Sequence, residues 1–277
     1  MPRSTHAMLW LFFVLVFGWT WSFWIAAAVS GTSVQTNTGR LLLFLGLLGP
    51  LLGGIGFTSL TESKERRRDY WRRAVEARRI PARWWLVIFL FVPALLAGAA
   101  LLDVILGGVA PVQIGKAFDA LLATPLAIVP VLLRIVLQGP LPEELGWRGY
   151  ALDRLQARWN ALVASLILGA IWALWHFPLF FIRDMLHAER GAWSAWFWLF
   201  MIQTLAAAVI YTWIYNNTHR SILAAILFHF ISNLSYEVAQ PNDSMNFYIA
   251  LLWVMSAIGV VAYCGARTLT RHRPTRH

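Results

Sequence analysis

The sequence contains few acidic residues, a single cysteine and no long polar segment. Only 13 of its 277 residues are Asp or Glu, and Cys264 is the one cysteine. One cysteine excludes an intramolecular disulfide framework and a cysteine-rich metal site. The longest polar stretch, residues 61–83, is too short to bury a core of its own. No internal repeat or low-complexity tract divides the chain, so we expect residues 1–277 to form a single membrane domain.

Apolar residues are what the chain has in excess. They make up 59% of the sequence, with 16 Trp and 17 Phe, and the mean hydropathy is +0.60. Apolar runs near the roughly 20 residues that cross a bilayer recur along the chain. The expected spans are 7–29, 41–60, 84–106, 121–138, 161–182, 193–213, 222–235 and 247–266. The sequence therefore predicts an all-α fold, a polytopic membrane helical bundle of about eight transmembrane helices.

Positive charge dominates, with 23 Lys and Arg and a net charge of +10. If the N-terminus is cytoplasmic, eight spans place 18 of these 23 residues on the cytoplasmic side, nine of them within 61–83. The basic residues expected outside are Arg40, Lys116, Arg183 and Arg190. This asymmetry is the positive-inside pattern, so the charge is interpreted as a topology signal. We expect both termini to be cytoplasmic and no nucleic-acid partner.

The segment KERRRDYWRRAVEARR, residues 64–79, carries much of this charge. Its pattern is typical of an amphipathic helix that lies on the membrane surface. We expect this cytoplasmic helix to contact anionic lipid headgroups. Membrane lipid is thus the first partner that the sequence predicts.

Ionisable residues are nearly absent from the first three spans. Within 7–106, outside the basic loop 61–83, the exception at membrane depth is Asp103. Ionisable side chains in a membrane cost roughly 2.5 to 3.5 kcal/mol each on insertion scales and usually face the bundle interior. We interpret 7–106 as a three-helix scaffold.

The rest of the intramembrane polarity lies between Arg134 and Asn233. Residues 121–238 are therefore expected to hold the functional helices. The last span, 247–266, follows them without a polar motif of its own.

The stretch GPLPEELGWRGY, residues 139–150, places two adjacent carboxylates after the fourth predicted span. Pro142 suits the first turn of a helix, where the helix dipole favours the carboxylates of Glu143 and Glu144. Glu144 and Arg148 stand at i and i+4 and can pair on one face, whereas Glu143 points about 100° away. A capped interfacial helix with a surface ion pair explains the same residues.

Two histidine motifs follow on later spans. WALWHFP puts Trp172 and His176 on one helix face, and HFISN does the same for His229 and Asn233. Of the seven histidines, only His176 and His229 lie within predicted spans. Each motif taken alone is also explained as a polar contact between helices.

Together, these carboxylates, imidazoles and the carboxamide form a set suited to hydrolysis. Glu143 could accept a proton from water while neutral donors stabilise an oxyanion. Alternatively, Glu143, His176 and His229 match the two-histidine, one-carboxylate ligand set of a catalytic zinc site. The residues themselves indicate hydrolysis, with or without a metal.

The ordered motifs resemble the CPBP family, the CAAX prenyl protease and bacteriocin-processing membrane proteins, also called the Abi family and related to type II CAAX prenyl endopeptidases. The residues that carry the resemblance are Glu143, Glu144 and Arg148 in an E-E-x-x-x-R motif, Trp172 and His176 in an aromatic-x-x-x-H motif, and His229 and Asn233 in an H-x-x-x-N motif. These motifs span about 90 residues. In one departure, Trp172 stands where the family usually shows Phe, which keeps an aromatic wall.

The resemblance implies an intramembrane endopeptidase that acts on a membrane-associated or prenylated protein or peptide, in the plasma membrane of a bacterium or archaeon. It also implies a role for each motif residue. These roles are a water-activating base (Glu143), its two supporting residues (Glu144 and Arg148), a second catalytic residue (His176) and two oxyanion ligands (His229 and Asn233). Water activated by glutamate without a metal is the preferred mechanism, and zinc is the alternative.

Two other functions are compatible with the same residues. A non-catalytic immunity or scaffold protein could keep the fold and use the polar site to bind a partner. A proton-coupled transporter could use the Glu and His residues as a relay. Transporters often show matching helix breaks in two halves, whereas here the breaks and charges are concentrated in one half.

The depth of the two histidines raises a question about the fifth span. At 1.5 Å per residue, His176 lies about 22 Å along the helix from Ala161, whereas His229 lies only about 12 Å from the cytoplasmic end of its span. Residues of one site should lie at one depth. We therefore expect the fifth helix to begin earlier, with DRLQARWN, residues 153–160, as a cytosolic extension.

Overall fold

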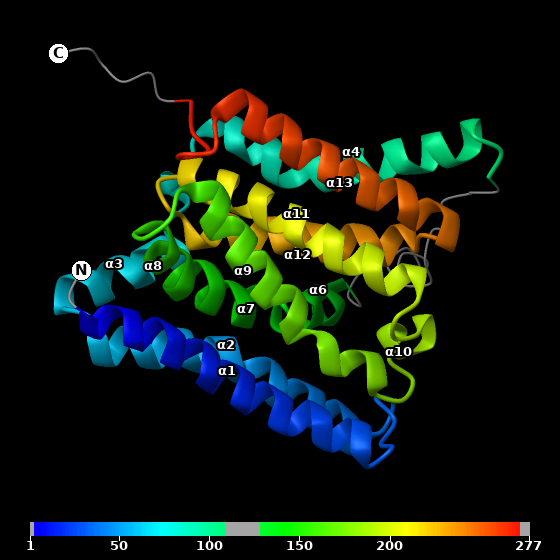
Figure 1. Ribbon diagram of the computed structural model, residues 1–277, viewed down its shortest axis with the longest axis horizontal. Coiled ribbons are helices and arrows are strands. Elements are labelled where there is room, and N and C mark those ends of the chain that lie inside the picture. Colours follow the sequence, from blue (N-terminus) through cyan, green and yellow to red (C-terminus); the bar gives the residue numbers. More distant parts are fainter. Residues whose placement is uncertain (1–2, 109–127, 272–277) are drawn as a thin grey trace.

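The structure is a computed structural model that describes residues 3–108 and 128–271. Within these ranges every regular element is helical, and the helices form one elongated bundle (Figure 1). Seven of the described helices are long and apolar enough to cross a membrane. They are α1 (Arg3–Val29), α2 (Asn37–Thr61), α4 (Ala82–Ile105), α9 (Ala161–Trp175) with the 3-10 helix η4 (Phe177–Phe181), α11 (Ala195–Asn217), α12 (Ile222–Ala239) and α13 (Asp243–Cys264). The predicted all-α, polytopic bundle is confirmed.

The fourth predicted span, 121–138, lies partly outside the described residues. The described part of this span forms α6 (Ile128–Leu137). It is followed by α7 (Pro140–Gly146), the π-helical turn η3 (Trp147–Ala151) and α8 (Leu152–Gln156). Pro140 and Pro142 lie in the first turn of α7, where a proline's missing N–H costs no helical hydrogen bond. Both prolines are buried, so α7 starts inside the bundle rather than at its surface.

The expected cytosolic extension of the fifth helix is wrong. α9 begins at Ala161, because the Asn160 side chain caps it by accepting a hydrogen bond from the N–H of Val163 at 2.9 Å. Residues 153–160 instead belong to α8 and the turn after it. His176 lies at the end of α9, where the helix gives way to η4.

The two ends of the bundle differ in what they carry (Figure 1). α1 starts and α13 ends at the same end, beside α3 (Lys64–Val75) and α8, whereas the short helix α10 (Leu186–Arg190) lies at the opposite end. We call these the α3 end and the α10 end.

The scaffold helix α2 approaches α7 closely. A Cβ atom on Gly146 would lie 2.5 Å from the backbone oxygen of Pro50, and one on Gly54 would lie 2.5 Å from the backbone oxygen of Leu145. Neither position admits a larger residue without backbone movement, which is why glycine is required there. α2 therefore supports α7 through direct backbone contact.

The predicted amphipathic helix forms as α3 and lies against the protein with one face. Tyr70 and Arg73 are buried, and the Tyr70 hydroxyl donates to the backbone oxygen of Leu145 in α7 at 3.0 Å. Burial raises the pKa of Tyr70, which keeps its hydroxyl protonated as a donor. Around the rest of its surface, α3 carries the exposed basic residues Lys64, Arg66, Arg67, Arg68 and Arg72.

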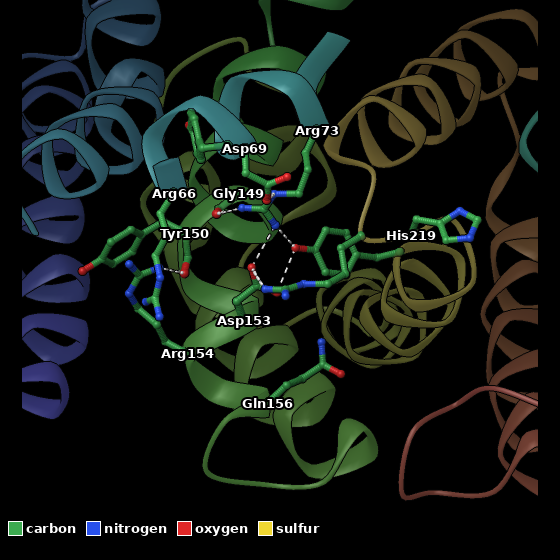
Figure 2. A network of polar contacts seen from close by, with 12 residues as sticks. Arg66, Asp69, Arg73, Gly149, Tyr150, Asp153, Arg154, Gln156 and His219 are labelled. Atoms are coloured by element: carbon green, nitrogen blue, oxygen red, sulfur yellow. Dashed lines mark hydrogen bonds and ion pairs between the residues drawn. The ribbon is translucent and has the colours of Figure 1, made fainter. Parts of the chain in front are cut away.

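A polar network centred on Asp153 fixes α3 at this end (Figure 2). Arg73 Nη1 donates to Asp153 Oδ2 at 2.8 Å and to the Tyr215 hydroxyl at 2.5 Å. Tyr215 donates in turn to Asp153 Oδ1 at 2.9 Å, and Arg220 Nε donates to the same oxygen at 2.9 Å. Both carboxylate oxygens of Asp153 therefore have partners, from α3, from α11 and from the residues that precede α12. We call this the Asp153 cluster.

Candidate active site

Glu143 and Glu144 lie at the start of α7 with almost no exposure. The two residues are 4% and 0% exposed. The N–H of Glu143 donates to the backbone oxygen of Gly139 at 2.9 Å, which sets the beginning of the helix. Because consecutive helical side chains point about 100° apart, the two carboxylates face different partners.

Glu144 accepts two hydrogen bonds on one oxygen. Arg148 Nη1 donates to Glu144 Oε1 at 2.9 Å, and His229 Nδ1 lies 2.8 Å from the same oxygen. Arg148 is 0% exposed and His229 is 6% exposed. Within the described residues, Glu144 Oε2 and the Nε and Nη2 atoms of Arg148 have no hydrogen-bond partner. The expected pair of Glu144 and Arg148 forms, and it also holds His229 of α12; we call these three residues the Glu144 cluster.

Two aromatic rings cover the guanidinium of Arg148. Its Cζ lies 4.1 Å from the ring centroid of Tyr211 and 4.8 Å from that of Trp172. A cation within about 6 Å of an aromatic face is attracted by the negative face of the ring. Arg148 itself lies in the π-helical turn η3, and such turns occur frequently at functional sites.

Glu143 is held by Trp172. The indole Nε1 of Trp172 donates to Glu143 Oε2 at 2.6 Å, in fully buried surroundings. The sequence predicted an aromatic wall at this position, but the indole N–H is a donor that the phenylalanine usual in the family cannot supply. One oxygen of Glu143 is thus fixed, which leaves Oε1 for another partner.

Three polar atoms meet at the open side of Gly139. A Cβ atom on this glycine would lie 3.1 Å from Asn233 Nδ2, 3.4 Å from Glu143 Oε1 and 3.6 Å from His229 Nε2. Asn233 Nδ2, Glu143 Oε1 and His229 Nε2 therefore lie near one another, on the side of Gly139 where another residue would carry its side chain. We call this point, bounded by Glu143, His229 and Asn233, the Gly139 space.

His176 contacts Trp172 and is not joined to the Gly139 space by a hydrogen bond. Its ring centroid lies 6.0 Å from that of Trp172, and the His229 ring lies 5.7 Å from the same indole. His176 Nδ1 lies 2.8 Å from the backbone oxygen of Trp172. Because a carbonyl oxygen only accepts, Nδ1 carries the proton and Nε2 of the neutral ring is an acceptor. Among the described contacts, none joins His176 to Glu143 by a hydrogen bond.

The scaffold positions the end of α9 that carries His176. Trp21 Nε1 of α1 donates to the backbone oxygen of Trp175 at 3.1 Å. Trp175 Nε1 donates to Thr20 Oγ1 of α1 at 2.9 Å. Since Trp175 is fully buried, these two bonds fix the last turn of α9 and the residue that follows it.

Three residues near the site fall outside the predicted set. Gly139 stands in the stretch of residues 139–150, but the sequence predicts no role for it in the site. Tyr211 covers Arg148, and the His187 ring stacks on His176 at 6.3 Å with an interplanar angle of 10°. Tyr211 and His187 reach the site by the packing of α11 and α10, which leaves no spacing signal in the sequence.

The alternative zinc ligands, Glu143, His176 and His229, are not arranged around one point. In residues 3–108 and 128–271, no group of three or more His, Cys, Asp or Glu is placed to hold a metal ion. The Nδ1 atoms of both histidines are already engaged, one with a backbone oxygen and the other with Glu144. The described side chains do not fit a three-ligand zinc site, and we derive no step through a metal.

The sequence around this site, and most of the chain, is similar to known proteins. Residues 125–235 match the family model described as type II CAAX prenyl endopeptidase Rce1-like, and this range includes all the predicted site residues. The chain is also similar to CAAX prenyl protease 2 of Methanococcus maripaludis, with 32% identity over 251 residues, 89% of this chain and 91% of the relative. The similarity therefore extends through the scaffold helices as well as the motifs.

Proposed function

The chain belongs to the type II CAAX prenyl endopeptidase Rce1-like family and is a membrane protease, and we propose that it cleaves a peptide bond of a membrane-associated or prenylated substrate with water activated by Glu143. The observation that carries the proposal is the meeting of Glu143 Oε1, His229 Nε2 and Asn233 Nδ2 at the Gly139 space. Hydrolysis of an amide requires a proton acceptor and oxyanion donors at one point.

In the first step, a water molecule in the Gly139 space loses a proton to Glu143 Oε1 as its oxygen attacks the scissile carbonyl carbon. Glu143 Oε2 stays with the indole of Trp172, so the carboxylate does not rotate away. Negative charge develops on the carbonyl oxygen, and Asn233 Nδ2 donates to it. Preorganised donors of this kind are each worth roughly 10²–10³ in rate.

His229 supplies the second oxyanion donor in its protonated form. Protonated imidazole donates from both ring nitrogens. Nδ1 then donates to Glu144 Oε1, and Nε2 donates towards the Gly139 space. Glu144 and Arg148 thereby act as positioning residues, because they orient His229 without touching the reacting atoms.

In the second step, the tetrahedral intermediate collapses and the carbon–nitrogen bond breaks. The leaving nitrogen takes the proton that Glu143 removed from water, which gives a carboxylic acid and an amine. The acid then loses the second proton of the water to solvent and becomes a carboxylate. We assign to His176 the transfer of the first proton to the leaving nitrogen, because its Nε2 is the acceptor nitrogen of the neutral ring. Glu143 returns to its ionised form for the next turnover.

Cleavage of a prenylated peptide by purified Glu143→Gln protein tests the proposal. The amide keeps the size of the side chain and cannot take a proton, so turnover should fall by roughly 10²–10⁴. Glu189→Gln, at an exposed position of α10, is the matched control and should cleave at the wild-type rate. Wild-type turnover in Glu143→Gln protein would refute the role of Glu143.

A second variant tests the Gly139 space. Gly139→Ala would put a methyl group 3.1 Å from Asn233 Nδ2, in the place assigned to water and the scissile carbonyl, and should abolish most turnover. The matched control is Gly56→Ala, since a Cβ atom there has nothing within 4 Å. Equal turnover in the two alanine variants would show that the reaction does not occur at this space.

Metal analysis tests the choice of a metal-free mechanism. We expect activity to survive exhaustive chelation, because Glu143 itself activates the water. Near-stoichiometric zinc in the purified protein, together with activity lost on chelation and restored by zinc, would overturn the mechanism. That outcome would leave the protease assignment unchanged.

The α3 end is proposed to face the cytoplasm of a bacterium or archaeon, with both termini on that side. The positive-inside rule supports this orientation, since the basic residues of α3 lie at the end where α1 starts. The exposed basic face of α3 would contact anionic lipid headgroups. Reporter fusions after Arg73 should read as internal and after Arg190 as external, and an external Arg73 fusion would reverse the orientation.

A further inference from the structure

The polar face of α12 continues beyond the site. His229, Asn233 and Glu237 follow one another at four-residue spacing and therefore share one helix face. Glu237 Oε1 accepts a hydrogen bond from Arg134 Nη2 of α6 at 2.5 Å. We propose that Arg134 binds the C-terminal carboxylate of the substrate, so that the enzyme selects peptides with a free chain end a few residues beyond the scissile bond. This inference rests on the proposed function and names a substrate feature that it requires.

The spacing along α12 fits such a substrate. Eight residues separate His229 from Glu237, which is about 12 Å along a helix at 1.5 Å per residue. In a C-terminal C-a-a-X sequence, three residues follow the prenylated cysteine. An extended chain spans about 3.3 Å per residue, so the carboxylate lies about 10 Å beyond the cysteine. A peptide with its cysteine carbonyl at the Gly139 space would bring its carboxylate to the level of Arg134.

The place of α6 agrees with this path. Arg134 stands five residues before Gly139 in the sequence, and α6 lies on the α10 side of α7 (Figure 1). α12 runs antiparallel to the segment from α6 to α7, from the α3 end towards the α10 end, so its later residues lie on the same side of the site as α6. The Gly139 space and Arg134 are therefore successive points along two neighbouring helices.

The chemistry of Arg134 suits a carboxylate ligand. A guanidinium can bind a carboxylate through two parallel hydrogen bonds, which a lysine cannot do. The side chains of Arg134 and Glu237 are 43% and 30% exposed, whereas those of the buried pair Arg148 and Glu144 are 0% exposed. Charged side chains within membrane proteins usually face a water-filled path. The exposed pair is thus reachable, and its guanidinium uses Nη2 alone for the described hydrogen bond.

A purely structural ion pair makes a different prediction from a binding site. If the pair only connects α6 to α12, neutralising either Arg134 or Glu237 should lower the stability of the protein, and the effect should not depend on the substrate. If Arg134 binds the substrate carboxylate, Glu237 is a second negative charge beside the ligand. Neutralising Arg134 should then weaken substrate binding, and neutralising Glu237 should strengthen it.

The experiment compares one prenylated peptide in two forms, with a free C-terminal carboxylate and with a C-terminal amide. We expect wild-type protein to favour the acid by roughly tenfold to a hundredfold in kcat/KM. Arg134→Gln should remove this preference by raising KM for the acid, with the amide unchanged. Glu237→Gln should lower KM for the acid. Arg183→Gln, between η4 and α10 with a side chain that is 71% exposed, is the matched control and should keep the preference.

Each outcome tests either the binding of the substrate carboxylate by Arg134 or the proposed protease function. Equal cleavage of acid and amide by wild-type protein would overturn the inference and leave the protease function intact. An acid preference retained in Arg134→Gln would overturn it as well. If wild-type protein cleaves neither peptide nor any other prenylated substrate, the proposed function fails. Should Arg134→Gln fail to fold, the sign of the KM change in Glu237→Gln decides, because a structural pair cannot lower KM for the acid alone.

Discussion

Two clusters, each centred on a carboxylate, lie on the segment from α7 to α8. They differ in whether both oxygens of that carboxylate have hydrogen-bond partners. In the Asp153 cluster, both oxygens of Asp153 accept hydrogen bonds, from Arg73 on one side and from Tyr215 and Arg220 on the other. In the Glu144 cluster, Glu144 Oε1 takes both donors and Oε2 has no partner among the described residues. The carboxylate of the Asp153 cluster is satisfied, although Arg73 Nε has no hydrogen-bond partner in the described part of the chain. In the Glu144 cluster, by contrast, the carboxylate itself keeps an unpartnered oxygen, and two guanidinium nitrogens of Arg148 also have no partner among the described residues.

The difference separates a cluster that holds the fold from one that also serves chemistry. Buried polar groups are normally all hydrogen-bonded, so atoms left without partners are expected at functional sites. Next to the Glu144 cluster, Glu143 Oε1, His229 Nε2 and Asn233 Nδ2 lie around Gly139, which has no side chain to separate them. The Asp153 cluster has no such arrangement described beside it, and its function is to fix α3 to the core.

Glu144→Gln should have the largest effect on stability. The change leaves Arg148 charged and unpaired in a fully buried place, and breaking a buried pair in this way costs about 3 kcal/mol. Melting in detergent should therefore occur at a clearly lower temperature, with a smaller loss of turnover per folded molecule. If Glu143→Gln and Glu144→Gln lose turnover equally without loss of stability, the two carboxylates act as one unit.

Addition of Arg148→Leu to Glu144→Gln sharpens this test. The double variant has neither half of the buried pair, so its loss of stability should be smaller than the sum of the two single losses. A melting curve of the three variants in one detergent measures the coupling. Strict additivity would show that the pair contributes nothing beyond its separate side chains.

Asp153→Asn should lower stability without lowering turnover. Arg73 and Arg220 would lose their shared carboxylate, and hydrogen bonds to charged groups contribute about 2 kcal/mol. The kcat of the folded fraction should match wild type, because the Asp153 cluster orients no reacting group. Loss of kcat as large as in Glu144→Gln would break the distinction between the two clusters.

Trp172→Phe should have a moderate effect on rate alone. The change keeps an aromatic ring against Arg148 and His176 but removes the indole donor to Glu143 Oε2. Loss of a hydrogen bond to a charged group corresponds to roughly tenfold in kcat, with KM unchanged. Because the family usually has Phe here, activity should persist. An unchanged kcat would show that Trp172 contributes aromatic packing and that its hydrogen bond to Glu143 does not affect the rate.

The smallest effect is expected from Glu76 at the end of α3. Hydrogen bonds, first from Arg72 and then from Arg78 and Arg79, lower the pKa of Glu76 from 4.5 to about 2. A lowered pKa contributes stability that is present above pH 4.5 and is lost as the pH falls towards 2. The melting temperature of wild-type protein should therefore fall slightly as the pH is lowered from 4.5 towards 2, and this part of the fall should be absent in Glu76→Gln. An identical pH profile in the variant would contradict this contribution.

Local patterns were enough to predict the pieces of the site. Pro142 placed Glu143 in a first helical turn, and four-residue spacing paired Glu144 with Arg148, as found. The error at residues 153–160 arose because an apolar span was extended through Asn160. A capping side chain at the start of a helix outweighs a continued helical pattern. Both histidine rings lie within about 6 Å of the Trp172 ring, so the wrong step was the inference that a shared depth requires an earlier helix start.

The sequence by itself determined the membrane class, the helical spans and the identity of the polar residues, because hydrophobic length and helical periodicity are properties of neighbouring residues. Only the tertiary structure decided that His229 meets Glu144, that Trp172 donates to Glu143 and that Gly139 lies beside the Glu143 and His229 side chains. These contacts join helices far apart in the chain. Their geometry depends on how α7, α9 and α12 pack, and packing is set by the shapes of many side chains at once rather than by any local pattern.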